Sequence, residues 1–153
     1  MENKSRVNVW TTLKDRVNES LEDEGKKLRI TLLEIEQLSN TIEELSRIKS
    51  DYHPDHLASS EGSALIGQIQ RNWNFVANIE DAIRKTNGQR LSVKKKERDL
   101  GALCANLEIE VKKYETLENR ALSKYKKLEA SKEMKAADEI STSFWLRTKN
   151  DST

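Results

Sequence analysis

The sequence predicts an all-α fold, an antiparallel two-helix coiled-coil hairpin in which the second helix is the longer one. Apolar residues recur every seven positions in two separate frames, and such a repeat needs a partner helix to cover its seam. The only proline of the chain lies between the two frames. Charged residues make up 35% of the chain and aromatic residues 5%, which is typical of long coiled-coil helices.

The first helix is expected over about residues 5–52. Its seam positions, a and d of the heptad, are mostly apolar, although a few carry charged or hydroxyl side chains. In chain order these positions are Val7, Trp10, Lys14, Val17, Leu21, Glu24, Leu28, Thr31, Ile35, Leu38, Ile42, Leu45, Lys49 and Tyr52.

A turn is expected over residues 53–61. Pro54 lacks an amide hydrogen and disfavours helical geometry in the residue before it, so the first helix should end near Tyr52. Ser59 or Ser60 is expected to cap the following helix. Because the connection is short and each helix needs a partner, the simplest arrangement is an antiparallel hairpin.

The second helix is expected over about residues 62–143, followed by a flexible tail at 144–153, with residues 1–153 forming a single coiled-coil domain. Its heptad frame continues without interruption and is again mostly apolar. The seam positions are Leu65, Ile69, Asn72, Val76, Ile79, Ile83, Thr86, Arg90, Val93, Glu97, Leu100, Cys104, Leu107, Val111, Tyr114, Glu118, Ala121, Tyr125 and Leu128.

The two predicted helices differ in length. At 1.5 Å per residue they measure about 70 Å and about 120 Å. If the chain folds back near residue 57, Trp10 lies opposite residue 104, and most of 112–143 extends past the first helix with its seam uncovered. Two interpretations stay open: this seam docks in a partner, or it mediates self-association.

Residues suited to catalysis or metal binding are scarce, and we expect no enzyme, no catalytic residue and no cofactor. Cys104, the only cysteine, falls on a seam position, which favours a buried thiol without a disulfide and a cytoplasmic location. His53 and His56 share the turn, but their spacing matches no structural zinc pattern, so no metal is expected. No segment resembles a signal peptide or a membrane span.

Basic side chains are concentrated in the second half of the chain, whereas acidic ones prevail in the first half. Two basic groups, around residues 90–98 and 124–127, could contact nucleic-acid phosphates. Glutamates interleave with the basic residues and the aromatic residues lie on the seam. A solvated coiled-coil flank is therefore predicted, and no nucleic-acid partner.

An aromatic patch lies at the start of the second helix. Phe75, Ile79 and Ala82 fall at i, i+4 and i+7, which makes one stripe that a groove on another protein could accept. Trp73 flanks the same seam. The alternative is that these aromatic residues only widen the cover over the coiled-coil seam.

The chain also resembles the FliJ family, small stalk proteins of flagellar type III export with relatives in virulence secretion. The similarity is carried by Trp10-Thr11-Thr12-Leu13-Lys14-Asp15, by Trp73-x-Phe75-Val76-x-x-Ile79-Glu80-x-Ala82-Ile83 and by Lys135-x-x-Asp138-Glu139-Ile140. The overall plan is similar too, with a shorter first helix and a longer, basic second one.

This resemblance implies a cytoplasmic, non-enzymatic stalk, peripheral to the membrane at the export apparatus. Its implied partners are a hexameric export ATPase, the cytoplasmic domain of the export-gate membrane protein and export chaperones. Phe75, Ile79 and Ala82 match the family's gate-binding stripe, and a further polar position of that stripe falls on Thr86. The alternative from another class is a structural coiled-coil scaffold that self-oligomerises.

Overall fold

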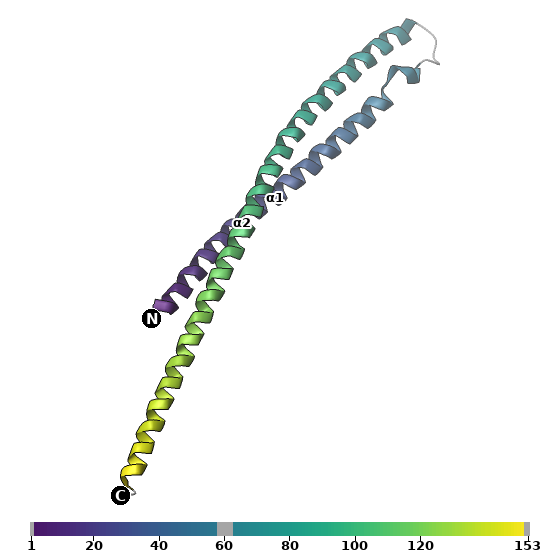
Figure 1. Ribbon diagram of the computed structural model, residues 1–153. Coiled ribbons are helices and arrows are strands. Elements are labelled where there is room, and N and C mark those ends of the chain that lie inside the picture. Colours follow the sequence, from purple (N-terminus) through teal and green to yellow (C-terminus); the bar gives the residue numbers. More distant parts are fainter. Residues whose placement is uncertain (1, 58–62, 152–153) are drawn as a thin grey trace. The chain divides into compact units, whose positions relative to one another are not determined.

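The computed structural model describes residues 2–57 and 63–151, and this part of the chain contains helices and no strand. Helix α1 spans Glu2–Asp51, a short 3-10 helix, η1, spans Pro54–Leu57, and helix α2 spans Ser63–Asp151 (Figure 1). The predicted fold class is confirmed, because two long helices form an antiparallel hairpin and the second helix is the longer one.

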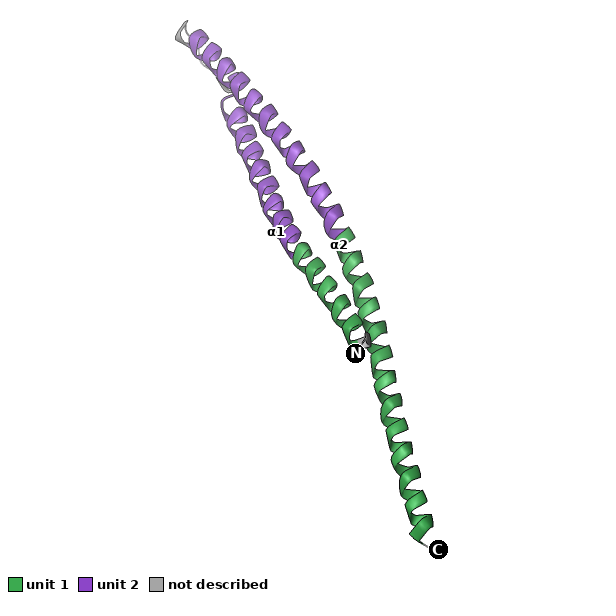
Figure 2. Ribbon diagram, turned by 90° about the vertical axis from the view of Figure 1, so that its left-hand side faces the viewer, with its two compact units in different colours: residues 1–21, 106–153 green, residues 22–105 purple. Residues whose placement is uncertain are grey.

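The chain divides into two compact units, and each pairs one piece of α1 with one piece of α2 (Figure 2). Unit 1 consists of Met1–Leu21 and Asn106–Thr153, and unit 2 consists of Glu22–Ala105. That residues 1–153 behave as a single domain stays a prediction.

Burial follows the predicted heptad frames in both helices. Every seam position from Val7 to Lys49 and from Leu65 to Tyr125 is buried or half-buried. The most deeply buried side chains are Val76, 2% exposed, and Thr31, 1% exposed. The hydroxyl of Thr31 donates to the carbonyl of Lys27 at 2.8 Å, so this polar group enters the seam with its hydrogen bond satisfied.

The pairing register differs from the predicted one. In unit 2, Lys49 pairs with Glu80 at 3.2 Å, which puts the midpoint of the paired residues several positions beyond residue 57. In unit 1, the ring of Trp10 stacks on Tyr114, with centroids 6.1 Å apart, rather than facing residue 104. The prediction that the seam is uncovered from residue 112 was wrong.

The seam of unit 1 stays covered as far as Tyr125, and Leu128, the next seam residue, is 44% exposed. Beyond it, every described residue from 130 to 151 is exposed. No residue of α1 accompanies this part of α2 in unit 1 (Figure 2).

The end of α1 lies close to its predicted place. The amide of Tyr52 still donates to the carbonyl of Ile48 at 3.0 Å, and the amide of His53 donates to Ser50 at 3.3 Å. Pro54 then opens η1 and is buried. The predicted caps Ser59 and Ser60 lie outside the described residues.

The predicted tail from residue 144 was wrong as to its boundary, because α2 continues as a helix to Asp151. No glycine or proline follows Gly101 to interrupt it. The hydroxyl of Thr148 donates to the carbonyl of Phe144 at 2.9 Å. The ammonium group of Lys149 lies over the ring of Trp145, 4.9 Å from its centroid, and this i,i+4 contact favours the helix.

Candidate partner-binding surfaces

The predicted stripe lies on one edge of the seam in unit 2. Phe75 is 40% exposed, whereas Ile79 and Ala82 are half-buried. The three side chains belong to one helix, so the structure keeps them together as the i, i+4, i+7 spacing requires. Whether they bind a partner is not tested by their placement, and that role stays a proposal.

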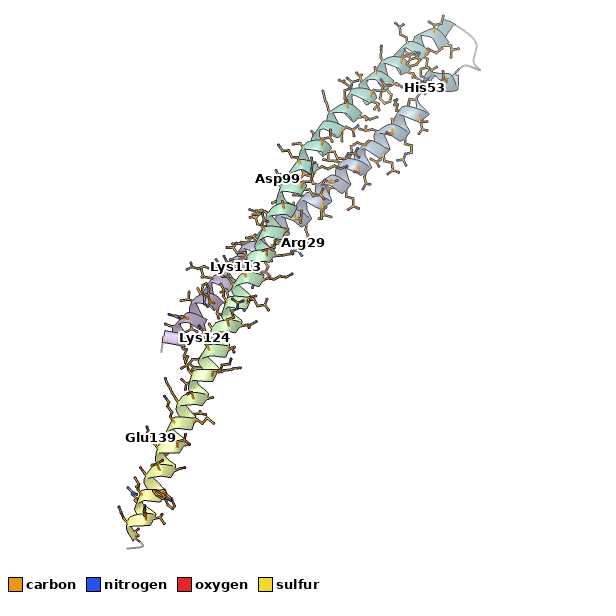
Figure 3. The ribbon with its side chains drawn as sticks, viewed as in Figure 1. Arg29, His53, Asp99, Lys113, Lys124 and Glu139 are labelled. Atoms are coloured by element: carbon orange, nitrogen blue, oxygen red, sulfur yellow. The ribbon has the colours of Figure 1, made fainter. Side chains whose placement is uncertain are left out.

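Two side chains just after the end of α1 contact this region, and the sequence did not predict these contacts. The ring of Tyr52 meets Phe75 edge-to-face, with centroids 5.0 Å apart, and the ring of His53 meets Trp73 in the same manner at 5.2 Å. Figure 3 labels His53 near the end of α1. Tyr52 occupies the last d position before the proline, and this heptad position is the only feature of the sequence that points to its contact with Phe75.

Thr86, where the family's further stripe position falls, uses its hydroxyl within its own helix. It donates to the carbonyl of Ala82 at 2.8 Å. Both acidic residues beside the stripe are paired, because Glu80 accepts from Lys49 and Asp81 accepts from Arg84 at 3.3 Å. An apolar stripe whose neighbouring carboxylates are paired is a surface suited to another apolar surface.

Unit 1 contains a polar network inside its seam. The Thr11 hydroxyl donates to Oε2 of Glu118 at 2.7 Å, and the Lys14 ammonium donates to Oε1 at 2.9 Å. Hydrogen bonds from Thr11 and Lys14 lower the pKa of Glu118, although desolvation opposes the shift. The hydrogen bond to Glu118 raises the pKa of Lys14, again against desolvation.

A groove of about 620 Å³ lies beside this network in unit 1. Apolar side chains from both helices form its floor and basic side chains form its rim. Its lining residues are Arg6, Val9, Trp10, Leu117, Arg120, Ala121, Ser123, Lys124 and Lys127. The sequence predicts a solvated flank for the basic group at 124–127, because the contribution of α1 to the groove depends on a register that the sequence does not predict.

The described part of the chain offers no group of three or more acidic, histidine or cysteine side chains that could hold a metal ion. His53 instead faces Asp55, with Nδ1 and Oδ2 3.2 Å apart, and the side chain of His56 is not among those described. Cys104 is buried on its seam position, as predicted. No described helix is long and apolar enough to cross a membrane.

A family model, described as the flagellar FliJ protein, matches residues 10–150 of the chain. The chain belongs to the FliJ family. This match covers nearly the whole chain and confirms the resemblance seen in the sequence. No curated protein and no solved structure matched in the corresponding comparisons.

Membership of the FliJ family makes this chain a component of the flagellar export apparatus, associated with other parts of that apparatus. The family is one of structural components rather than enzymes. The coiled-coil hairpin described above fits that class, because its seam residues pack between the two helices and the exposed surfaces beside the seam are suited to contacts with other proteins.

Proposed function

We propose that this FliJ-family chain is a cytoplasmic stalk, peripheral to the membrane, that links the hexameric export ATPase to the cytoplasmic domain of the export-gate membrane protein. Two observations support this proposal. The family model matches residues 10–150, and each of the two units leaves apolar side chains exposed beside a covered seam. Contacts with export chaperones belong to the same proposal and rest on the family alone.

The gate contact is assigned to the stripe of Phe75, Ile79 and Ala82 in unit 2. The ring of Phe75 meets that of Tyr52 but stays 40% exposed, so it retains surface for a partner groove. Aromatic anchors of this kind contribute about 2 kcal/mol or more to binding when a groove encloses them.

Phe75→Ala tests the gate contact. Loss of the ring contact with Tyr52 should cost about 1 kcal/mol of folding stability. Affinity for the isolated cytoplasmic domain of the gate protein, measured by titration calorimetry, should fall about thirtyfold or more.

Trp73→Ala is the matched control, because it removes a similar edge-to-face contact, with His53, from a position outside the stripe. The control should lose comparable stability and keep its gate affinity. Equal gate affinity in the two variants would contradict the assignment of the stripe.

The ATPase contact is assigned to the part of α2 that lacks an accompanying helix. Every described residue from 130 to 151 is exposed, and among them are the large apolar side chains of Met134, Ile140, Phe144, Trp145 and Leu146. Such a segment presents a free helical surface to a ring-shaped partner.

Removal of residues 130–153 tests this contact. The truncated chain keeps Tyr114 and Glu118, so the pairing of unit 1 should survive and the thermal midpoint should change little. Stimulation of ATP hydrolysis by the export ATPase should disappear. Full stimulation by the truncated chain would count against the proposal, and a stable oligomer in sedimentation equilibrium would favour the scaffold alternative.

A further inference from the structure

The groove of unit 1 has an apolar floor that solvent reaches. Val9 is 53% exposed although it lies next to the seam residue Trp10, and Leu117 and Ala121 complete the floor from α2. Ala121 is buried in the two-helix seam, whereas Val9 leaves apolar surface open to the groove.

The rim of the groove carries charge of one sign. Arg6, Arg120, Lys124 and Lys127 line it, and no acidic side chain does. Among the described residues none of these four takes part in an ion pair. The nearby carboxylate of Glu118 is engaged by Thr11 and Lys14, so it does not neutralise the rim.

We propose that this groove binds an acidic amphipathic helix of a partner protein, which lies along the hairpin as a third helix. A helix with one apolar stripe and acidic flanks complements an apolar floor between basic rims. The lining residues of α2 run from Leu117 to Lys127, which is about 15 Å and accommodates about three turns of a partner helix.

Nucleic acid fits this surface less well. Binding of single strands relies on aromatic faces that stack with bases, but the ring of Trp10 is stacked on Tyr114 at an interplanar angle of 26°. An apolar floor also contributes nothing to phosphate recognition. An anionic lipid surface shares the required charge, so the experiment includes it as a separate arm.

The probe is a fluorescently labelled peptide of four helical turns with leucines at i, i+4 and i+7 and glutamates on both flanks. Its binding to the full-length chain is followed by fluorescence anisotropy. A peptide of the same composition with a scrambled order, and vesicles containing phosphatidylserine, are measured beside it. The proposal expects binding of the ordered peptide only, with an affinity that falls as salt rises.

The variant Lys124→Glu/Lys127→Glu reverses two rim charges on exposed positions and should weaken peptide binding about tenfold or more. The matched control is Lys112→Glu/Lys113→Glu, which reverses two exposed lysines of unit 1 outside the groove. Figure 3 labels Lys113 and Lys124, one from each pair. The control should bind the peptide within about twofold of the unaltered chain.

A third variant, Val9→Asp, alters the floor without touching the seam and should weaken binding several-fold. Equal loss in the two lysine variants, or equal binding of the scrambled peptide, would overturn the proposal in favour of general charge attraction. Vesicle binding that depends on Lys124 would overturn it in favour of a lipid surface. None of these readouts uses the ATPase or the gate protein, so failure here leaves the proposed function intact.

Discussion

The interaction between Lys14 and Glu118 should contribute measurably to stability, and a double-mutant cycle isolates it. Lys14→Met keeps the apolar stem of the lysine, and Glu118→Gln keeps the shape of the glutamate, so each change mainly removes a charge. The pair is joined by a 2.9 Å bond, and the side chains are 24% and 17% exposed.

The expected magnitude lies between two limits. Fully exposed ion pairs contribute about 0.2–1 kcal/mol, and well-shielded hydrogen bonds to charged groups contribute about 1.5–3 kcal/mol. Partial exposure and the second hydrogen bond, from Thr11, place the coupling at about 1 kcal/mol. Each single variant should lose more than this, because it leaves one charged or polar group of the seam without its partner.

The coupling should also depend on pH in a defined direction. The pKa of Glu118 is lowered in the folded chain, so its contribution is present above the unfolded value of about 4.3 and is lost as the pH falls through the folded value. The pKa of Lys14 is raised, so its contribution is present below about 10.4 and is lost as the pH rises further. The plateau therefore spans about pH 5 to 10.

Urea unfolding of the four chains, followed by far-ultraviolet circular dichroism at pH 7 and pH 3, measures the coupling. We expect about 1 kcal/mol at pH 7 and a clearly smaller value at pH 3. A coupling below about 0.3 kcal/mol at pH 7, or one that is unchanged at pH 3, would refute the reasoning, since the pair would then behave as solvated.

Two further predictions concern the core and the helix backbone. Val76→Ala should lower the free energy of unfolding by about 1.5–2 kcal/mol. Leu91→Ala, at a residue that is 67% exposed, should change it by less than about 0.5 kcal/mol. Urea unfolding measures both variants. Gly25→Ala and Gly101→Ala should each raise the free energy of unfolding by about 1 kcal/mol, because a Cβ at either position meets nothing within 4 Å. The thermal midpoint of each variant should rise accordingly. A loss of stability in either alanine variant would contradict a regular helix there.

The seam could be predicted from the sequence because heptad spacing alone determines which side chains face a partner helix. This holds even where the residue is polar, as for Thr31, which is buried on a d position beside the exposed Ile30 and Leu33. The break near Pro54 could also be predicted, because the missing amide hydrogen of proline acts locally and does not depend on which residues pair.

The register could not be predicted in the same way, because heptad positions repeat every seven residues and the connection determines which repeat is used. The pairing of Lys49 with Glu80 depends on the geometry of η1 and the residues after it, for which the sequence carries no periodic signal. The contact between Tyr52 and Phe75, and the contribution of α1 to the groove, depend on that register and were missed with it.

Polar residues on the seam have a mechanical consequence. An apolar heptad seam would let one helix slide along the other by two turns and find equivalent partners again. Such a slide in unit 1 would bring Glu118 opposite Val7 or Leu21 and remove its bonds to Thr11 and Lys14. Within unit 2, the bond from Arg90 to Ser39 at 3.4 Å and the ion pair of Lys49 with Glu80 oppose the same movement. When one helix of either unit is pulled along its axis, these polar contacts therefore oppose sliding and transmit the force to the partner helix.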